Sequence, residues 1–156
     1  MNAEKRLLAR LLEEAYAIQT WHGPNLRGSV RGVNAKEASW RPRRGRHNIR
    51  EIVVHAAYWK YAVRRRLTGE KRGSFPLKGS NWFGLSGRGK EWKAEVALLD
   101  REHRALLRAV ASLPASRLHR KAPGSKYEWM RMIFGVACHD VYHAGQIQLL
   151  KRLLRS

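Results

Sequence analysis

Cysteine is nearly absent from this chain. The 156 residues contain one, Cys138, so the sequence excludes an internal disulfide framework and any CxxC-type zinc or redox site. In the helix expected around it, this thiol is predicted to be a small buried hydrophobe.

Acidic residues are also scarce, since 12 Asp and Glu stand against 32 Lys and Arg and leave a net charge of +20. Such a surface attracts polyanions and can bind nucleic acid non-specifically at low salt. The basic residues occur along the whole chain, however, and no zinc-finger, basic-zipper or RNP pattern accompanies them. Solvated basic helix faces are the simpler interpretation, and attraction of an anionic small molecule lies between the two.

Long hydrophobic runs are missing as well. No stretch approaches the roughly 18 consecutive apolar residues of a membrane span, and the N-terminal segment MNAEKRLLARLLEEAY has acidic residues in place of a cleavable apolar core. These absences predict a cytoplasmic protein with no signal peptide and no membrane contact. The hydrophobic fraction of 44% nevertheless suffices for a core, and residues 1–156 have the size of a single domain.

Apolar residues recur at steps of three and four in four segments, which predicts helices over Ala3–Gln19, Asn48–Thr68, Glu91–Leu113 and Tyr127–Leu154. Asn48 with Glu51 three residues later is a capping-box pattern at the start of the second helix. The stretches 23–47 and 69–90 are glycine-rich and aperiodic, although the first has room for a short turn of helix. The fold class is therefore all-α: a four-helix bundle, up-and-down or crossover, with long loops after helices 1 and 2.

Two histidines on the last helix carry the chemical signal. His139 and His143 are four residues apart, so both rings can reach one ion, and their phase coincides with the apolar face of that helix. Burying imidazoles among aliphatic side chains is costly unless their nitrogens are satisfied, and a metal ion does that. Packed histidines are the alternative for the pair alone.

A third ligand has to come from another helix, and His55 is the best candidate because it lies mid-helix at the edge of the apolar stripe. Three neutral imidazoles with the remaining positions left to water are typical of an open, catalysis-capable site. Nitrogen ligation favours a divalent zinc, nickel, iron or copper ion over magnesium or calcium.

Four further residues are candidates for the pocket. His103 falls on the seam of the third helix and is either a donor or base near the metal, or a packed histidine. Gln146 follows His143 on the same face and can hold a water or substrate, or contact that ring. Tyr58 and Trp59 flank His55 and either wall the pocket or belong to the core.

Several other residues lead to simpler expectations. The Trp82-Phe83 pair in the glycine-rich stretch suggests a lid or a dimer contact. Asp140 is poorly aimed at the metal and is expected to pair with an arginine of a neighbouring helix. His47 lies in a connection and is expected at the surface, like His22 and His119.

The sequence resembles the DinB/YfiT-like superfamily. The resemblance rests on the segments 47–59 (HNIREIVVHAAYW), 67–69 (LTG) and 139–147 (HDVYHAGQI), with Trp40-Arg41-Pro42 before them, and it covers about Leu7 to Leu154. It implies a four-helix bundle that holds a divalent metal through His55, His139 and His143, and frequent homodimerisation. The strong basicity is a departure from the family.

Relatives of this kind include thiol-dependent S-transferases and isomerases that use low-molecular-weight thiols. The resemblance therefore implies a metal-dependent S-transferase or hydrolase acting on a small molecule, which the basic charge would draw if it is anionic. No carboxylate lies clearly on the histidine face, which slightly favours thiol transfer over hydrolysis. The alternative is a non-catalytic stress-response or nucleic-acid-associated protein with a structural or vestigial metal.

Overall fold

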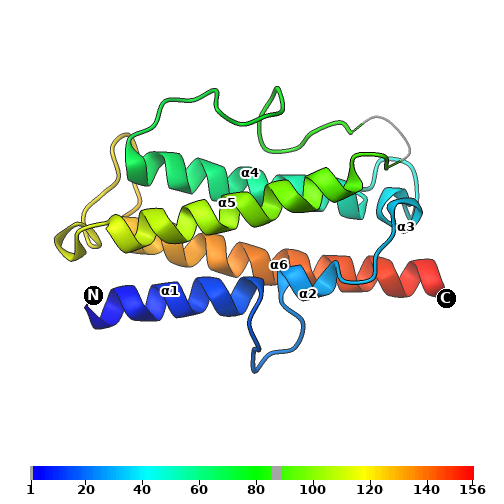
Figure 1. Ribbon diagram of the computed structural model, residues 1–156, viewed down its shortest axis with the longest axis horizontal. Coiled ribbons are helices and arrows are strands. Elements are labelled where there is room, and N and C mark those ends of the chain that lie inside the picture. Colours follow the sequence, from blue (N-terminus) through cyan, green and yellow to red (C-terminus); the bar gives the residue numbers. More distant parts are fainter. Residues whose placement is uncertain (1, 86–88) are drawn as a thin grey trace.

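Four long helices form a bundle in the computed structural model, which describes residues 2–85 and 89–156 (Figure 1). They are α1 (Ala3–Tyr16), α4 (Ile49–Thr68), α5 (Trp92–Ser112) and α6 (Trp129–Arg155). α1 and α4 each pack against both α5 and α6, which closes the bundle. The described part contains no β-strand, so the all-α expectation is confirmed.

The first connection is partly helical, as its length allowed, with α2 (Leu26–Ser29) and α3 (Ala35–Ser39). α4 and α5 run in the same direction, opposite to α1 and α6 (Figure 1). The connection between α4 and α5 therefore returns along the length of the bundle, passing over α4. This is the crossover arrangement, and residues 86–88 of the connection fall outside the described residues.

Local capping fixes both ends of α4 where the sequence predicts them. The Asn48 side chain accepts a hydrogen bond from the Glu51 amide (2.9 Å), and the Glu51 carboxylate accepts one from the Asn48 amide (3.3 Å). Gly69 ends the helix with φ 73°, a left-handed conformation that glycine adopts at little cost. α5 and α6 also begin and end within two residues of the expected positions.

The predicted end of the first helix at Gln19 is wrong. α1 ends at Tyr16 because Ala17 leaves helical geometry, with φ −140°. The side-chain amide of Asn25 then donates to the Ile18 carbonyl at 2.7 Å, which satisfies a backbone group beyond the helix end. Ile18, which lies within the predicted helix, is beyond its observed end and is exposed.

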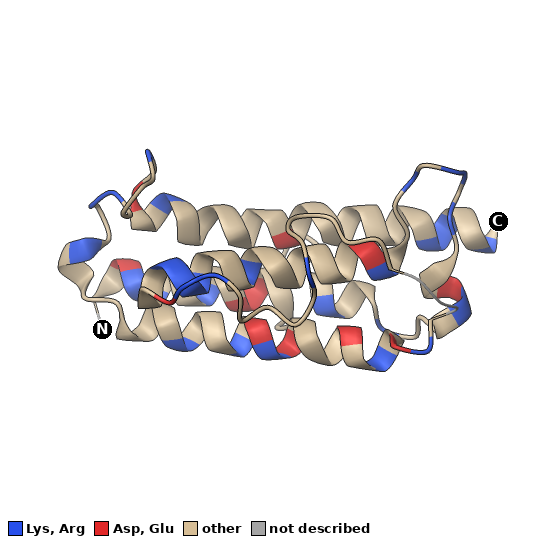
Figure 2. Ribbon diagram, turned by 90° about the horizontal axis from the view of Figure 1, so that it is seen from above, with Lys and Arg blue, Asp and Glu red and all other residues tan. Residues whose placement is uncertain are grey.

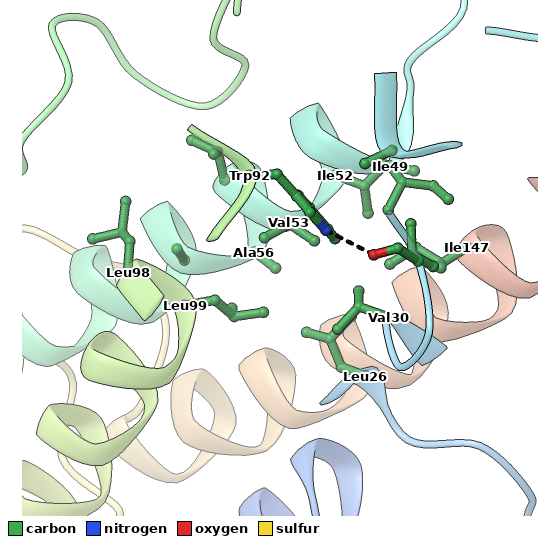
Figure 3. Packing of buried hydrophobic residues seen from close by; sticks show 14 of the residues in the cluster. Leu26, Val30, Ile49, Ile52, Val53, Ala56, Trp92, Leu98, Leu99 and Ile147 are labelled. Atoms are coloured by element: carbon green, nitrogen blue, oxygen red, sulfur yellow. Dashed lines mark hydrogen bonds between the residues drawn. The ribbon is translucent and has the colours of Figure 1, made fainter. Parts of the chain in front are cut away.

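The core has two apolar clusters, one at each end of the bundle. The first joins α2 and the first halves of α4 and α5 to the C-terminal half of α6, and Figure 3 shows its centre around Trp92 and Ile147. The indole of Trp92 donates to the Val33 carbonyl at 2.8 Å and so ties the first connection to α5. The second cluster joins α1, the second half of α5 and the first half of α6.

A layer of buried polar side chains separates the two clusters. Lys60 of α4, His103 of α5 and Asp140 of α6 all lie in it and are all buried. The Lys60 ammonium donates to the Asp140 carboxylate and lies 3.3 Å from Nδ1 of His103. The expected arginine partner of Asp140 is therefore wrong: Lys60 is the cation that α4 places beside Asp140, whereas Arg64 pairs with Glu102 at 3.0 Å.

Lys and Arg lie along all four long helices and their connections, interspersed with the fewer acidic residues (Figure 2). None of the helices in the described residues combines the length and the hydropathy that crossing a bilayer requires.

Candidate metal centre

Three histidine rings from two helices meet between α4 and α6. His55 comes from α4, and His139 and His143 come from successive turns of α6. The Nε2 atoms of His55 and His143 each lie 3.0 Å from Nε2 of His139, and the candidate ligand atoms all lie within 4.8 Å of one another. His55 and His143 are buried and His139 is half-buried. The structure thus brings together the three residues that the sequence singles out.

The hydrogen bonds behind the rings determine which nitrogens face inward. Nδ1 of His55 lies 2.9 Å from the Asn81 carbonyl oxygen, and Nδ1 of His143 lies 2.6 Å from Oε1 of Gln146. Carbonyl oxygens only accept, so both Nδ1 atoms carry the proton and both Nε2 atoms present lone pairs. Nδ1 of His139 is buried and has no hydrogen-bond partner among residues 2–85 and 89–156. The three Nε2 atoms that converge carry at most one proton between them, that of His139. A cation bound by all three would satisfy their lone pairs, and the set fits a divalent metal ion.

Burial keeps these rings in the form that binds metal. It lowers the pKa of His139 to about 3, helped by the nearby His143 and His55 rings, and the pKa of His143 to about 4. Burial also lowers the pKa of His55. At neutral pH all three imidazoles are therefore uncharged, as ligation requires.

The long connection after α4 covers one side of the cluster. The Trp82 ring stacks on His55 with centroids 3.8 Å apart and planes within 8°, and it also stacks on His47 at 3.6 Å. Phe83 is buried in the core, 5.3 Å from Phe75 between ring centroids. Trp82 and Phe83 therefore have different roles. Trp82 covers the candidate ligand His55, and Phe83 packs the α4–α5 connection against the core.

Asn81 is a functional residue that sequence reasoning missed. Its φ of 64° is left-handed, which asparagine tolerates better than other non-glycine residues. In this conformation its carbonyl meets Nδ1 of His55, and its side-chain oxygen accepts a hydrogen bond from the Trp59 indole at 2.9 Å. An asparagine among glycines signals such a turn, but only the fold places it against His55.

The other candidates divide between the cluster and the core. Gln146 supports His143, and it also donates to the Tyr142 hydroxyl at 3.0 Å. Trp59 stands edge-on to both His55 and His139, with centroids 6.4 and 6.3 Å away. Tyr58, in contrast, packs in an aromatic cluster with Phe75 and Phe83.

His103 has the contacts of a packed histidine, one of the two alternatives for it. Its ring stacks on Tyr16 at 3.8 Å, Nδ1 lies 3.3 Å from the Lys60 ammonium, and Nε2 lies 3.6 Å from a carboxylate oxygen of Glu13. Burial and the neighbouring Lys60 charge lower its pKa to about 2, so the ring is neutral.

The expectation that Cys138 is buried is wrong: the thiol is exposed, on the side of α6 where Phe134 and Tyr142 are exposed as well. His47 is exposed, as expected, but its ring also contacts the site. Its Nδ1 lies 2.9 Å from the Glu51 carboxylate, which orients the ring that stacks on Trp82.

A groove of about 610 Å³ between α4 and α6 opens onto His139. Its walls near the histidines are Trp59, Val63, Met132 and Val136, and Gly135 leaves space in the α6 wall. Among the described residues, no aspartate or glutamate lines it. A small organic molecule can therefore reach His139 along a largely apolar path.

The family profile described as the DinB superfamily matches residues 19–147, a span that includes all of α4 and the part of α6 that carries His139 and His143. No curated protein and no solved structure matches the chain.

Proposed function

Since this chain belongs to the DinB superfamily and has a three-histidine cluster of the kind that binds metal, we propose that it is a metal-dependent enzyme of the thiol S-transferase type. The observation that carries the proposal is the groove, which opens onto His139 and has no carboxylate along its walls. A hydrolase of the kind that uses Glu or Asp as its base needs such a group within hydrogen-bond reach of the attacking water.

The residues of the site would bind the metal ion, orient its ligands and exclude water. His55, His139 and His143 would hold the ion, which when bound lowers the pKa of a coordinated thiol or water. Asn81 and Gln146 keep the protons of His55 and His143 on Nδ1, so that Nε2 of each ring stays available. Trp82 excludes water from the His55 side by stacking on that ring.

The transfer itself requires no proton donor from the chain. The thiol loses its proton to water, and its sulfur forms a bond to an electrophilic carbon of the second substrate. The leaving group departs with the electron pair of the bond that breaks. The apolar walls at Trp59, Val63 and Val136 hold the second substrate in place during this step.

The first experiment measures metal content. Wild type, His139→Ala and His119→Ala are purified without chelator and analysed for bound metal; His119 is an exposed histidine bound to Glu4 and serves as the matched control. We expect about one ion per chain in the wild type and the control, and much less in His139→Ala. Equal sub-stoichiometric metal in all three would show that the cluster is not a metal site.

The second experiment tests the reaction class. Metal-loaded wild type is mixed with cysteine, glutathione or coenzyme A and with 1-chloro-2,4-dinitrobenzene, and the S-conjugate is measured. We expect conjugate formation above the uncatalysed rate, lost on chelation and in His139→Ala and restored by metal. Hydrolysis of p-nitrophenyl acetate without conjugation of any thiol would instead identify a hydrolase and overturn the transferase assignment.

A further inference from the structure

The groove that opens onto His139 is cationic at its other end. Arg66 of α4 and Arg131 of α6 line it there, beside Ser125 and Tyr127 of the α5–α6 connection. Within residues 2–85 and 89–156, neither arginine forms an ion pair with an acidic side chain; Arg131 lies over the Tyr127 ring, 4.6 Å from its centroid. The groove therefore has the imidazole of His139 at one end and, among the described residues, two guanidinium groups without an acidic partner at the other.

Helix geometry sets the distance between these ends. His55, Trp59, Val63 and Arg66 follow one another at steps of four, four and three, which places them on one face of α4. Arg66 lies eleven residues after His55, about 16 Å of helix rise, and Arg131 lies eight residues before His139, about 12 Å. Apolar side chains of both helices line the space between. One small molecule can thus contact both ends at once.

In the described part of the chain, no acidic side chain pairs with Arg66. Its side chain is half-buried, and burial together with the like charges of Arg65 and Arg72 lowers the pKa of its guanidinium. Further cations gather nearby: Arg117, Arg120 and others line a neighbouring cavity of about 420 Å³ that also includes Arg66. Figure 2 shows these basic segments at the end of the bundle where the N-terminus lies. An anionic ligand group would supply the missing countercharge.

We propose that this groove binds a substrate with an apolar body and a terminal anionic group, which Arg66 and Arg131 bind as a carboxylate, phosphate or sulfonate. The inference rests on the proposed function, because it places the reacting end of the substrate at the histidines. The planar guanidinium matches such oxyanions with two parallel hydrogen bonds. The apolar walls at Val63, Met132 and Val136 fit a compact organic body better than a polynucleotide backbone.

Two dyes with the same aromatic body test the proposal. 8-Anilinonaphthalene-1-sulfonate carries the anionic group, and N-phenyl-1-naphthylamine lacks it. Both are titrated by fluorescence into zinc-loaded wild type, Arg66→Gln, Arg131→Gln and Arg152→Gln. Arg152 is an exposed arginine of α6 outside the groove, so its variant loses the same formal charge.

We expect the Kd of the sulfonate dye to rise roughly tenfold in each groove variant and less than twofold in Arg152→Gln, since a charge-assisted hydrogen bond contributes about a factor of ten or more. The uncharged dye should bind all four proteins within about twofold, because its contacts are apolar. An unchanged Kd of the sulfonate dye in both groove variants would overturn the proposal. So would groove variants that lose random-duplex DNA binding but keep the sulfonate dye.

A variant with a larger side chain in the groove tests whether the dyes bind there. A Cβ added at Gly135 meets no atom within 4 Å, so the side chain of Gly135→Leu can project into the groove without a backbone clash. Both dyes should then bind at least fivefold more weakly; unchanged binding of both would place them elsewhere and overturn the assignment. His139→Ala separates this inference from the proposed function. If the metal is lost there and the sulfonate preference persists, the arginines carry the preference independently of the ion.

Discussion

Replacing Lys60 by methionine should lower the free energy of unfolding by about 3–5 kcal/mol. Lys60 and Asp140 have no exposed side-chain surface, and the ammonium group is the hydrogen-bond donor to Oδ2 of the carboxylate. Oδ1 of Asp140 is buried and has no hydrogen-bond partner in the part of the chain that the structure describes. Methionine retains the length of the side chain but removes the charge, so the carboxylate is left in the bundle with no counter-ion. For a chain of this length the loss corresponds to a Tm lower by about 6–20 °C.

A second variant replaces both Lys60 and Asp140. Lys60→Met combined with Asp140→Val removes the unpaired charge as well as the cation, so we expect a loss of less than about 1.5 kcal/mol, or a gain. Lys93→Met, on the exposed side of α5, is the control and should change stability by less than about 0.5 kcal/mol.

Thermal and urea unfolding followed by circular dichroism measures these changes. The protein is treated with chelator beforehand, because bound metal would add its own stabilisation. The reasoning is refuted if Lys60→Met loses less than about 1 kcal/mol, or if the double variant is as unstable as the single one.

Four more predictions follow from the structure. Gln146→Ala should weaken zinc binding about 10- to 100-fold by removing the acceptor of the His143 Nδ1 proton, whereas Gln146→Glu should retain it; competition with a chromogenic chelator measures both. Because burial lowers the pKa of His103 to about 2, only the unfolded chain takes up that proton as pH falls below about 6.5, so stability decreases toward acid. Between roughly pH 6 and pH 5, the free energy of unfolding of His103→Gln should fall by about 1 kcal/mol less than that of the wild type in denaturant titrations. The same pH dependence in both proteins would contradict this. The exposed apolar side chains of α6, Leu149 among them, are the expected face of the homodimer that the family resemblance implies. Leu149→Lys should then give monomers in sedimentation equilibrium, and a monomeric wild type would contradict the prediction. Finally, binding to random DNA should disappear by about 200 mM salt if it reflects the net charge of +20 alone; binding retained at that concentration would favour a nucleic-acid role.

The sequence by itself determined the four helices and the position of the histidine pair. Helix periodicity and caps are local properties, so the Asn48–Glu51 box and Gly69 could be assigned to the ends of α4 without a fold. The apolar phase around His139 and His143 is equally local, and it indicated that both rings point inward. That His55 lies opposite them was inferred from its place mid-helix and from the family resemblance.

Tertiary structure alone decided what surrounds these elements. Asn81 and Trp82 reach His55 across 26 and 27 positions of the chain, a separation that no periodicity encodes. α6 carries apolar residues on both its covered and its uncovered sides, so periodicity did not reveal that Cys138 lies on the uncovered one. The buried partner of Asp140 depended in the same way on which cation of α4 lies opposite it in the bundle. Local patterns determine which side of a helix is apolar, whereas packing against the other helices decides which groups then meet.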